Sequence, residues 1–129
     1  MNYKLNGKGF SILELMIVIV IVALLVALAL PSYSRYVRKA NRGEAQQLLL
    51  NWANIQEIWR ANDSDYAAVT DIPLPTHAMY TFALGNRTAG TYTLTATASG
   101  DQAKDKEKGV ACSAMTLNQS NAKTPAACW

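Results

Sequence analysis

The sequence predicts an α+β protein in which one long N-terminal helix packs on a small antiparallel sheet of three or four strands. Three observations support this fold class: a dense apolar block over residues 10–30, a helical spacing of apolar residues that continues to about residue 61, and period-two alternation farther along the chain. Three or more strands can bury one face against an amphipathic helix, which gives a two-layer head. The 129 residues suffice for one such domain and not for two.

The apolar block follows a short polar segment, residues 1–9, which carries two lysines. As a helix, the 21 residues from Phe10 to Leu30 span about 30 Å, the thickness of the hydrocarbon core of a bilayer. An ordinary secretory signal has a shorter apolar stretch followed by a small-residue cleavage site, and no A-x-A site precedes Pro31. We therefore expect residues 10–31 to be retained as a transmembrane helix. Hydropathy alone leaves a plain single-span anchor as the alternative.

One charged residue interrupts the apolar block. Glu14 lies four positions into it, where a carboxylate costs several kcal/mol unless it is paired or neutralised. Such a residue is a candidate functional residue by default. The alternative is that Glu14 lies close enough to the membrane interface to remain hydrated.

The helical pattern continues beyond Pro31, which is expected to bend or loosen the helix because it lacks an N–H group and clashes with the preceding turn. The helix is expected to end near Ala61, where Asn62-Asp63-Ser64-Asp65 supplies stop and turn residues. The apolar residues recur every three or four positions, with an interruption around Gly43 and Glu44, and comprise Tyr33, Tyr36, Val37, Ala40, Leu48, Trp52, Ile55 and Trp59. Both tryptophans of this stripe are expected to anchor the helix in the core.

The second half of the chain has strand signals. Residues 62–78 form a predicted loop, and the candidate strands are Met79–Leu84, Thr91–Ala98 and Ala111–Asn118. The clearest of these is TYTLTATA, in which threonine alternates with larger or apolar residues.

Charge gives little indication of a polyanionic partner. The net charge of +3 is too small to indicate nucleic-acid binding, and removal of residues 1–9 with Lys4 and Lys8 would lower it by two, to +1. In GDQAKDKEKG, residues 100–109, three acidic residues alternate with three lysines. This pattern is typical of a solvated loop rather than of a basic patch.

The two cysteines, Cys112 and Cys128, have two interpretations. In an oxidising compartment they could close a loop that stabilises the fold by roughly 3 kcal/mol, whereas in the cytosol they would stay reduced. Neither they nor the single histidine, His77, shows the spacing of a metal site, so we expect no metal. No nucleophile motif or phosphate-binding loop is present, so an enzyme is the least supported function and no cofactor is expected.

The N-terminal region resembles the cleavage and methylation motif of type IV prepilins. The resemblance rests on Lys8-Gly9-Phe10-Ser11-Ile12-Leu13-Glu14, in which a glycine precedes phenylalanine and Glu14 is the fifth residue after it, and on Pro31, which also matches the family. The match is strong over residues 8–60 and loose over residues 61–129. The ending Cys128-Trp129 resembles a minor pilin of the type IVa subclass with short leaders.

This resemblance implies a pilin fold and several roles. Prepilin peptidase would cut between Gly9 and Phe10, the new Phe10 amine would be methylated, and Glu14 would contact the Phe10 amine of a neighbouring subunit. Residues 1–9 would be the leader peptide, residues 10–31 the transmembrane and assembly helix, and residues 32–129 the head. The cysteine pair resembles the disulfide-bounded loop of pilins.

The same resemblance implies location and partners. The precursor would span the inner membrane once with its head in the periplasm, and it would then join other pilin subunits in a pilus at the cell surface. Counting charges near the span gives the opposite orientation, because only Lys4 and Lys8 precede it while Arg35, Arg38, Lys39 and Arg42 follow. We favour the orientation of the family, with which the cysteine pair agrees.

The leading hypothesis is a structural, minor subunit of a type IV pilus, and two alternatives remain open. A type II secretion pseudopilin shares the N-terminal signature. A pilin-like DNA-uptake receptor would need an exposed basic surface, but Lys104, Lys106 and Lys108 have acidic neighbours in the sequence. The sequence does not distinguish a filament for adhesion, twitching, DNA uptake or secretion.

Overall fold

The computed structural model describes residues 9–129, so the predicted leader lies outside the described residues except for Gly9. The chain separates into two compact units, with the division between Arg35 and Tyr36. The predicted segment boundaries at residues 9 and 31 stay predictions. Each unit is described by itself below.

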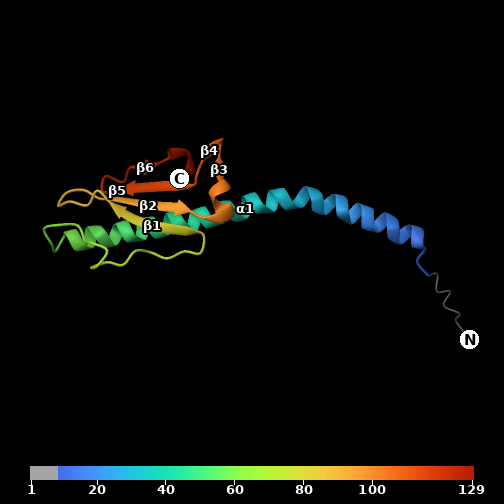
Figure 1. Cartoon of the computed structure of the whole chain (residues 1–129), viewed down its shortest axis with the longest axis horizontal. Coiled ribbons are helices and arrows are strands. Elements are labelled where there is room, and N and C mark those ends of the chain that lie inside the picture. The colour runs from blue at the N-terminus through green and yellow to red at the C-terminus, as the bar shows by residue number, and fades with distance from the viewer. Residues whose placement is uncertain (1–8) are drawn as a thin grey trace, which may run out of the picture. The chain divides into compact units, whose positions relative to one another are not determined.

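The long helix α1 covers Ile12–Arg60 (Figure 1). Its predicted end near Ala61 is confirmed, and the helix continues through Pro31 without a break in its assignment. The bend predicted at Pro31 stays a prediction. Within residues 9–35 every large apolar side chain is exposed, from 48% at Val18 to 82% at Phe10. An 18-residue window of this helix has a mean hydropathy of 3.2, so length and composition suffice to cross a membrane.

The second unit, the head, is a two-layer α+β structure. Antiparallel strands form a four-stranded sheet in the order β1-β2-β5-β6, which comprises β1 (Tyr80–Gly85), β2 (Thr93–Ala98), β5 (Ala114–Asn118) and β6 (Lys123–Thr124). A separate hairpin pairs β3 (Lys106–Glu107) with β4 (Val110–Ala111). Two 3-10 helices complete the head, η1 (Gly100–Lys104) and η2 (Ala126–Cys128). The predicted α+β class with a small antiparallel sheet is confirmed.

The core lies between the residues of α1 that belong to the head and one face of the sheet. Period-two alternation places Leu94 and Ala96 of β2 beside Met115 and Leu117 of β5 on the buried face, as their cross-strand pairing shows. The opposite face of β2 carries Thr93, Thr95 and Thr97, none of which is buried. The core therefore follows from the alternation that predicted the strand.

The buried face of the helix differs from the predicted stripe. It comprises Arg42, Ala45, Leu49, Trp52 and Gln56, of which only Trp52 belongs to the predicted set. Tyr36 is 74% exposed and Ile55 is 38% exposed. The apolar pattern gave the wrong face because two of the five buried residues are polar, and polar side chains are buried only when they are paired.

Two side chains of this buried face tie the loop after the helix to the core. Gln56 donates its amide to the carbonyl of Ala67 (3.0 Å) and accepts from the Ala67 N–H (2.8 Å). Trp52 donates its indole N–H to the carbonyl of Pro73 (3.0 Å). The prediction that Trp52 anchors the core is confirmed, whereas the prediction for Trp59 is wrong, because that side chain is only half-buried and lines a surface groove.

Candidate functional site

The predicted processing point lies directly before helix α1. Gly9 and Phe10 are exposed and precede the helix, and an added Cβ at Gly9 would meet no atom within 4 Å. Ser11 starts the helix, since its hydroxyl accepts from the Leu13 N–H (3.3 Å) and its carbonyl accepts from the Leu15 N–H (3.1 Å). The peptide bond between Gly9 and Phe10 therefore lies outside the helix, between two exposed residues.

Glu14 lies in the first turn of α1, where a carboxylate interacts favourably with the positive end of the helix dipole. Its side chain is exposed, and within residues 9–129 no basic group lies within ion-pair distance of it. The helix dipole offsets only part of the cost of placing this charge in an apolar surrounding.

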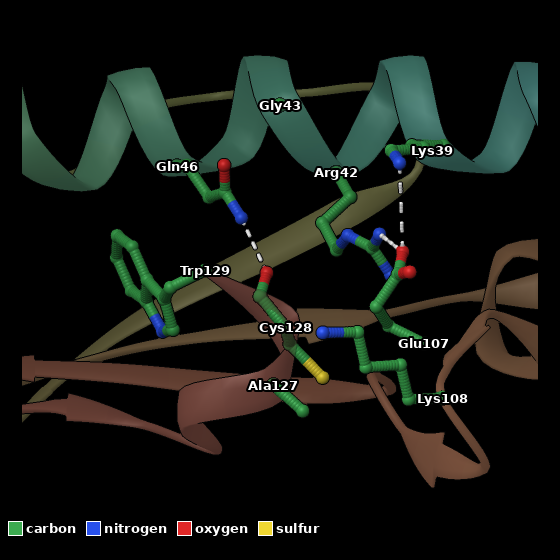
Figure 2. Close-up of a pocket in the computed structure, with 9 residues that line it drawn as sticks. All are labelled: Lys39, Arg42, Gly43, Gln46, Glu107, Lys108, Ala127, Cys128 and Trp129. Carbon is green, nitrogen blue, oxygen red and sulfur yellow. Dashed lines mark hydrogen bonds and ion pairs between the residues drawn. The ribbon is translucent and has the colours of Figure 1, made fainter.

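The head carries a pocket of about 340 Å³ beside helix η2 (Figure 2). Helix α1 supplies one wall, and the β3–β4 hairpin and the end of the chain supply the other. The lining residues are Lys39, Arg42, Gly43, Gln46, Glu107, Lys108, Ala127, Cys128 and Trp129. The pocket therefore combines three basic side chains, one acidic side chain and one indole ring.

The deepest charge beside this pocket is Arg42, whose side chain is 4% exposed. Its Nη1 donates to Oδ2 of Asp105 (2.9 Å), which is 5% exposed, and its Nη2 donates to Glu107, which is 28% exposed. The hydrogen bond from Arg42 to Glu107, together with the nearby charge of Lys39, holds the pKa of Glu107 below its usual value. The two terminal nitrogens of the Arg42 guanidinium therefore bind two different carboxylates.

Arg42 thus binds both acidic side chains of residues 105–108, a segment in which acidic and basic residues alternate in the sequence. Asp105 and Glu107 face Arg42, whereas Lys106 and Lys108 are exposed. Lys108 and Gly109 form the hairpin turn, and their φ angles of 49° and 83° are those of a type I′ turn. The predicted loop over residues 100–109 instead contains η1 and β3, and within it Asp105 and Glu107 bind Arg42 while Lys108 lines the pocket beside Glu107.

A second basic group lies at the end of the chain. The ammonium of Lys123 lies 5.1 Å from the centroid of the Trp129 ring, a cation–π contact. The Cys112–Cys128 disulfide, with a Cα–Cα distance of 5.6 Å, joins η2 to the segment after β4, and Gln46 of α1 donates to the Cys128 carbonyl. We call Lys106, Lys108 and Lys123, with Trp129, the basic edge.

Arg38, another basic residue that follows the span, is held by an acid of the head. Arg38 donates to Asp101 (2.7 Å), which also pairs with Lys104 (2.9 Å). The bond from Lys104, followed by that from Arg38, holds the pKa of Asp101 below its usual value. Arg38 and Arg42 therefore have intramolecular partners, which the sequence did not reveal because those partners lie more than sixty positions away.

His77 is part of the loop between α1 and β1. Its Nδ1 accepts from the Met79 N–H (3.0 Å), and its Nε2 lies 3.0 Å from Glu44 of α1. Because Nδ1 is an acceptor, Nε2 carries the proton and donates to the carboxylate. This histidine fastens the loop to the helix.

Comparison with family models identifies two matching regions. A model described as type IV minor pilin ComP, DNA uptake sequence receptor, matches residues 31–116, and a model of the prokaryotic N-terminal methylation motif matches residues 4–30. Together they cover the apolar segment, the head helix and most of the sheet.

Individual proteins give the same indication. The type IV wide pilus major component PilA4 of Thermus thermophilus is 32% identical over 113 residues, which cover 81% of this chain and 86% of that protein. Fimbrial protein EcpC of Eikenella corrodens is 51% identical over 41 residues, and the chain spans only 27% of its length.

A solved structure also resembles this fold. A type IV pilin from Shewanella oneidensis superposes with a TM-score of 0.57 at 21% identity, covering 71% of this chain and 97% of that one. At this identity the likeness concerns the fold alone.

Proposed function

The chain belongs to the family of type IV minor pilins that its matching model describes as DNA uptake sequence receptors, and from this premise we propose how it is processed, assembled and used. As a member of that family it is a structural subunit of a type IV pilus with an N-terminal methylation motif. Prepilin peptidase cuts between Gly9 and Phe10, and the new Phe10 amine is methylated. The role is structural rather than catalytic.

The observation that carries this proposal is the fully exposed apolar segment of α1. Its side chains have no cover within the described residues, and so much exposed apolar surface requires lipid or another protein. The precursor meets this requirement by spanning the inner membrane, and the assembled subunit meets it by packing against other subunits. Lipid gives little drive for helix association, whereas transfer to an aqueous filament gives a strong one.

Glu14 gives this assembly its axial register. An apolar helix packed against other apolar helices has no preferred axial position, whereas a buried charge pair has one. The methylated amine of Phe10 on a neighbouring subunit is a cation at the right end of the helix, and the low dielectric constant of a filament core strengthens its attraction to the carboxylate. Before assembly the head lies in the periplasm, where the Cys112–Cys128 disulfide is stable.

The test is incorporation of a Glu14→Leu variant into pili sheared from cells. We expect the variant to be processed and to remain in the membrane fraction, with at least tenfold less in the sheared pili, because one lost buried charge pair exceeds about 1.4 kcal/mol. Leu15→Met, at the adjacent exposed apolar residue, serves as the matched control. Normal incorporation of Glu14→Leu would remove the register role.

We also propose that the head binds DNA through the basic edge. The supporting observation is that Lys106 and Lys108 are exposed while their acidic neighbours, Asp105 and Glu107, are bound by Arg42. Exposed lysines bind phosphates by releasing counterions, and an aromatic ring beside them offers a surface for a base or sugar. The description of the matching family supports the same ligand.

Binding of a fluorescein-labelled mixed-sequence duplex to the mature chain in detergent tests this second function. Lys106→Gln/Lys108→Gln should weaken binding at low salt about tenfold and lower the slope of log affinity against log salt by about one to two. Lys104→Gln, which removes a lysine already paired with Asp101, is the matched control. Equal binding by the double variant and the wild type would exclude the basic edge as the DNA-binding surface.

A further inference from the structure

We propose that the buried residue Arg42 is a positioning residue for DNA binding, because it draws two carboxylates of the β3–β4 hairpin inward and leaves Lys106 and Lys108 as the charges that DNA meets. The inference rests on the DNA-binding function proposed above. Arg42 itself is 4% exposed, so it acts on the surface only through the groups that it holds.

The geometry requires an arginine at this position. Two nitrogens of one guanidinium bind two different carboxylates, Nη1 binding Asp105 and Nη2 binding Glu107. A lysine ammonium is a point charge on a flexible stem and does not reproduce this fork. Lys39 does not replace it, because its ammonium lies 3.8 Å from Glu107 and its side chain is 68% exposed.

The two carboxylates differ in how they would behave without Arg42. Asp105 is 5% exposed, and its backbone N–H and carbonyl are bonded to Gln102 and Cys112, so it stays inside the head. Glu107 is 28% exposed and lies between Lys106 and Lys108 in the sequence, next to the hairpin turn. Glu107 lies close to both lysines in either case, but without Arg42 its negative charge would lose its main partner and would repel the phosphates that the lysines attract.

This difference allows a test at constant net charge. Arg42→Gln/Asp105→Asn and Arg42→Gln/Glu107→Gln each remove one positive and one negative charge. The first leaves Glu107 ionised and without its arginine, whereas the second leaves only Asp105 without its arginine, a carboxylate that is 5% exposed and held inside the head. Affinity for the labelled mixed-sequence duplex is measured for the mature chain in detergent over a series of salt concentrations.

Charge positioning predicts opposite results for the two variants. Arg42→Gln/Asp105→Asn should bind about threefold to tenfold more weakly than the wild type, with a salt slope lower by about one, and Arg42→Gln/Glu107→Gln should bind like the wild type. Equal affinity in all three proteins would overturn the inference, because net charge would then decide binding. Equal loss in both double variants would also overturn it, because Arg42 would then act only through the fold.

A single conservative substitution tests the same inference if a double variant is too unstable to measure. Arg42→Lys keeps the charge but lacks the planar guanidinium whose two nitrogens reach the two carboxylates, and it should bind DNA more weakly than the wild type. Arg38→Lys is its matched control, one turn earlier on α1 and paired with the exposed Asp101. Wild-type affinity of Arg42→Lys would overturn the inference. If Lys106→Gln/Lys108→Gln weakens binding while Arg42→Lys does not, only the inference fails; if neither weakens it, the proposed DNA surface fails as well.

Discussion

The two halves of helix α1 use their apolar residues in opposite ways. In residues 12–30 the large apolar side chains are 48–81% exposed on every side, whereas in residues 42–56 one face is buried against the sheet. The first half therefore depends on a partner outside the chain, and the second half depends on the fold of the head. The comparison shows that one helix can carry an assembly surface and a core surface. What packs on each surface, rather than helix propensity, decides its role.

The largest difference is expected for the same substitution made in each half. Leu49→Ala, at a residue 1% exposed, should lower the free energy of unfolding of the head by about 2–5 kcal/mol through a cavity in the core. Leu24→Ala, at a residue 63% exposed, should leave it unchanged. Denaturant unfolding of the full chain in detergent, followed by tryptophan fluorescence, compares the two; equal destabilisation would show that the halves do not differ in this way.

The disulfide belongs to the head alone. Cys112→Ser/Cys128→Ser should lower head stability by roughly 3 kcal/mol, because the crosslink removes entropy from the unfolded loop of 16 residues between the sulfurs. The same unfolding experiment measures this, and the reducing agent dithiothreitol should give the wild type the stability of the variant. Membrane insertion should not change, and a defect in insertion would contradict the separation of the two regions.

A substitution of Gln56 tests whether the hydrogen bonds of a buried polar side chain stabilise the head. Gln56→Ala should destabilise the head by about 1–3 kcal/mol, because it leaves the N–H and the carbonyl of Ala67 without their partner. Gln47→Ala, at an exposed residue of the same helix, is the control and should have almost no effect. A neutral result for Gln56→Ala would mean that water replaces the amide without cost.

The smallest effect concerns pH. Because Arg42 holds the pKa of Glu107 below its unfolded value, this carboxylate contributes stability that is present above the unfolded pKa and is lost as pH falls through the folded one. The head should therefore lose stability as the pH is lowered below about 4.5. Glu107→Gln should melt at a temperature that changes less over this range than that of the wild type. Identical pH profiles would show that Glu107 is not held by Arg42.

Period-two and helical patterns predicted the main elements from the sequence, but not which face of the helix is buried. TYTLTATA became β2 because its alternation places Leu94 and Ala96 on one face, whereas the strands of two residues are too short to show a period. Arg42 and Gln56 lie on the buried face through partners far away in the sequence, so apolar spacing excluded them.

The candidate sites show the same limit. Gly9, Phe10 and Glu14 stand in one local motif, which the sequence displays directly and the methylation-motif model matches. The basic edge depends on tertiary contacts: the charges of residues 101–108 cancel along the chain, and the structure pairs Asp105 and Glu107 with Arg42 of α1.

Intact mass and N-terminal sequence, determined from cells that contain the prepilin peptidase and from cells that lack it, test the central proposal most directly. Processing at the exposed bond before α1 predicts a mature chain that begins with methylated Phe10, seen only when the peptidase is present. A chain that keeps Met1 in both cells, or one cut near Pro31, would contradict the proposal, and the role of Glu14 in assembly would fall with it.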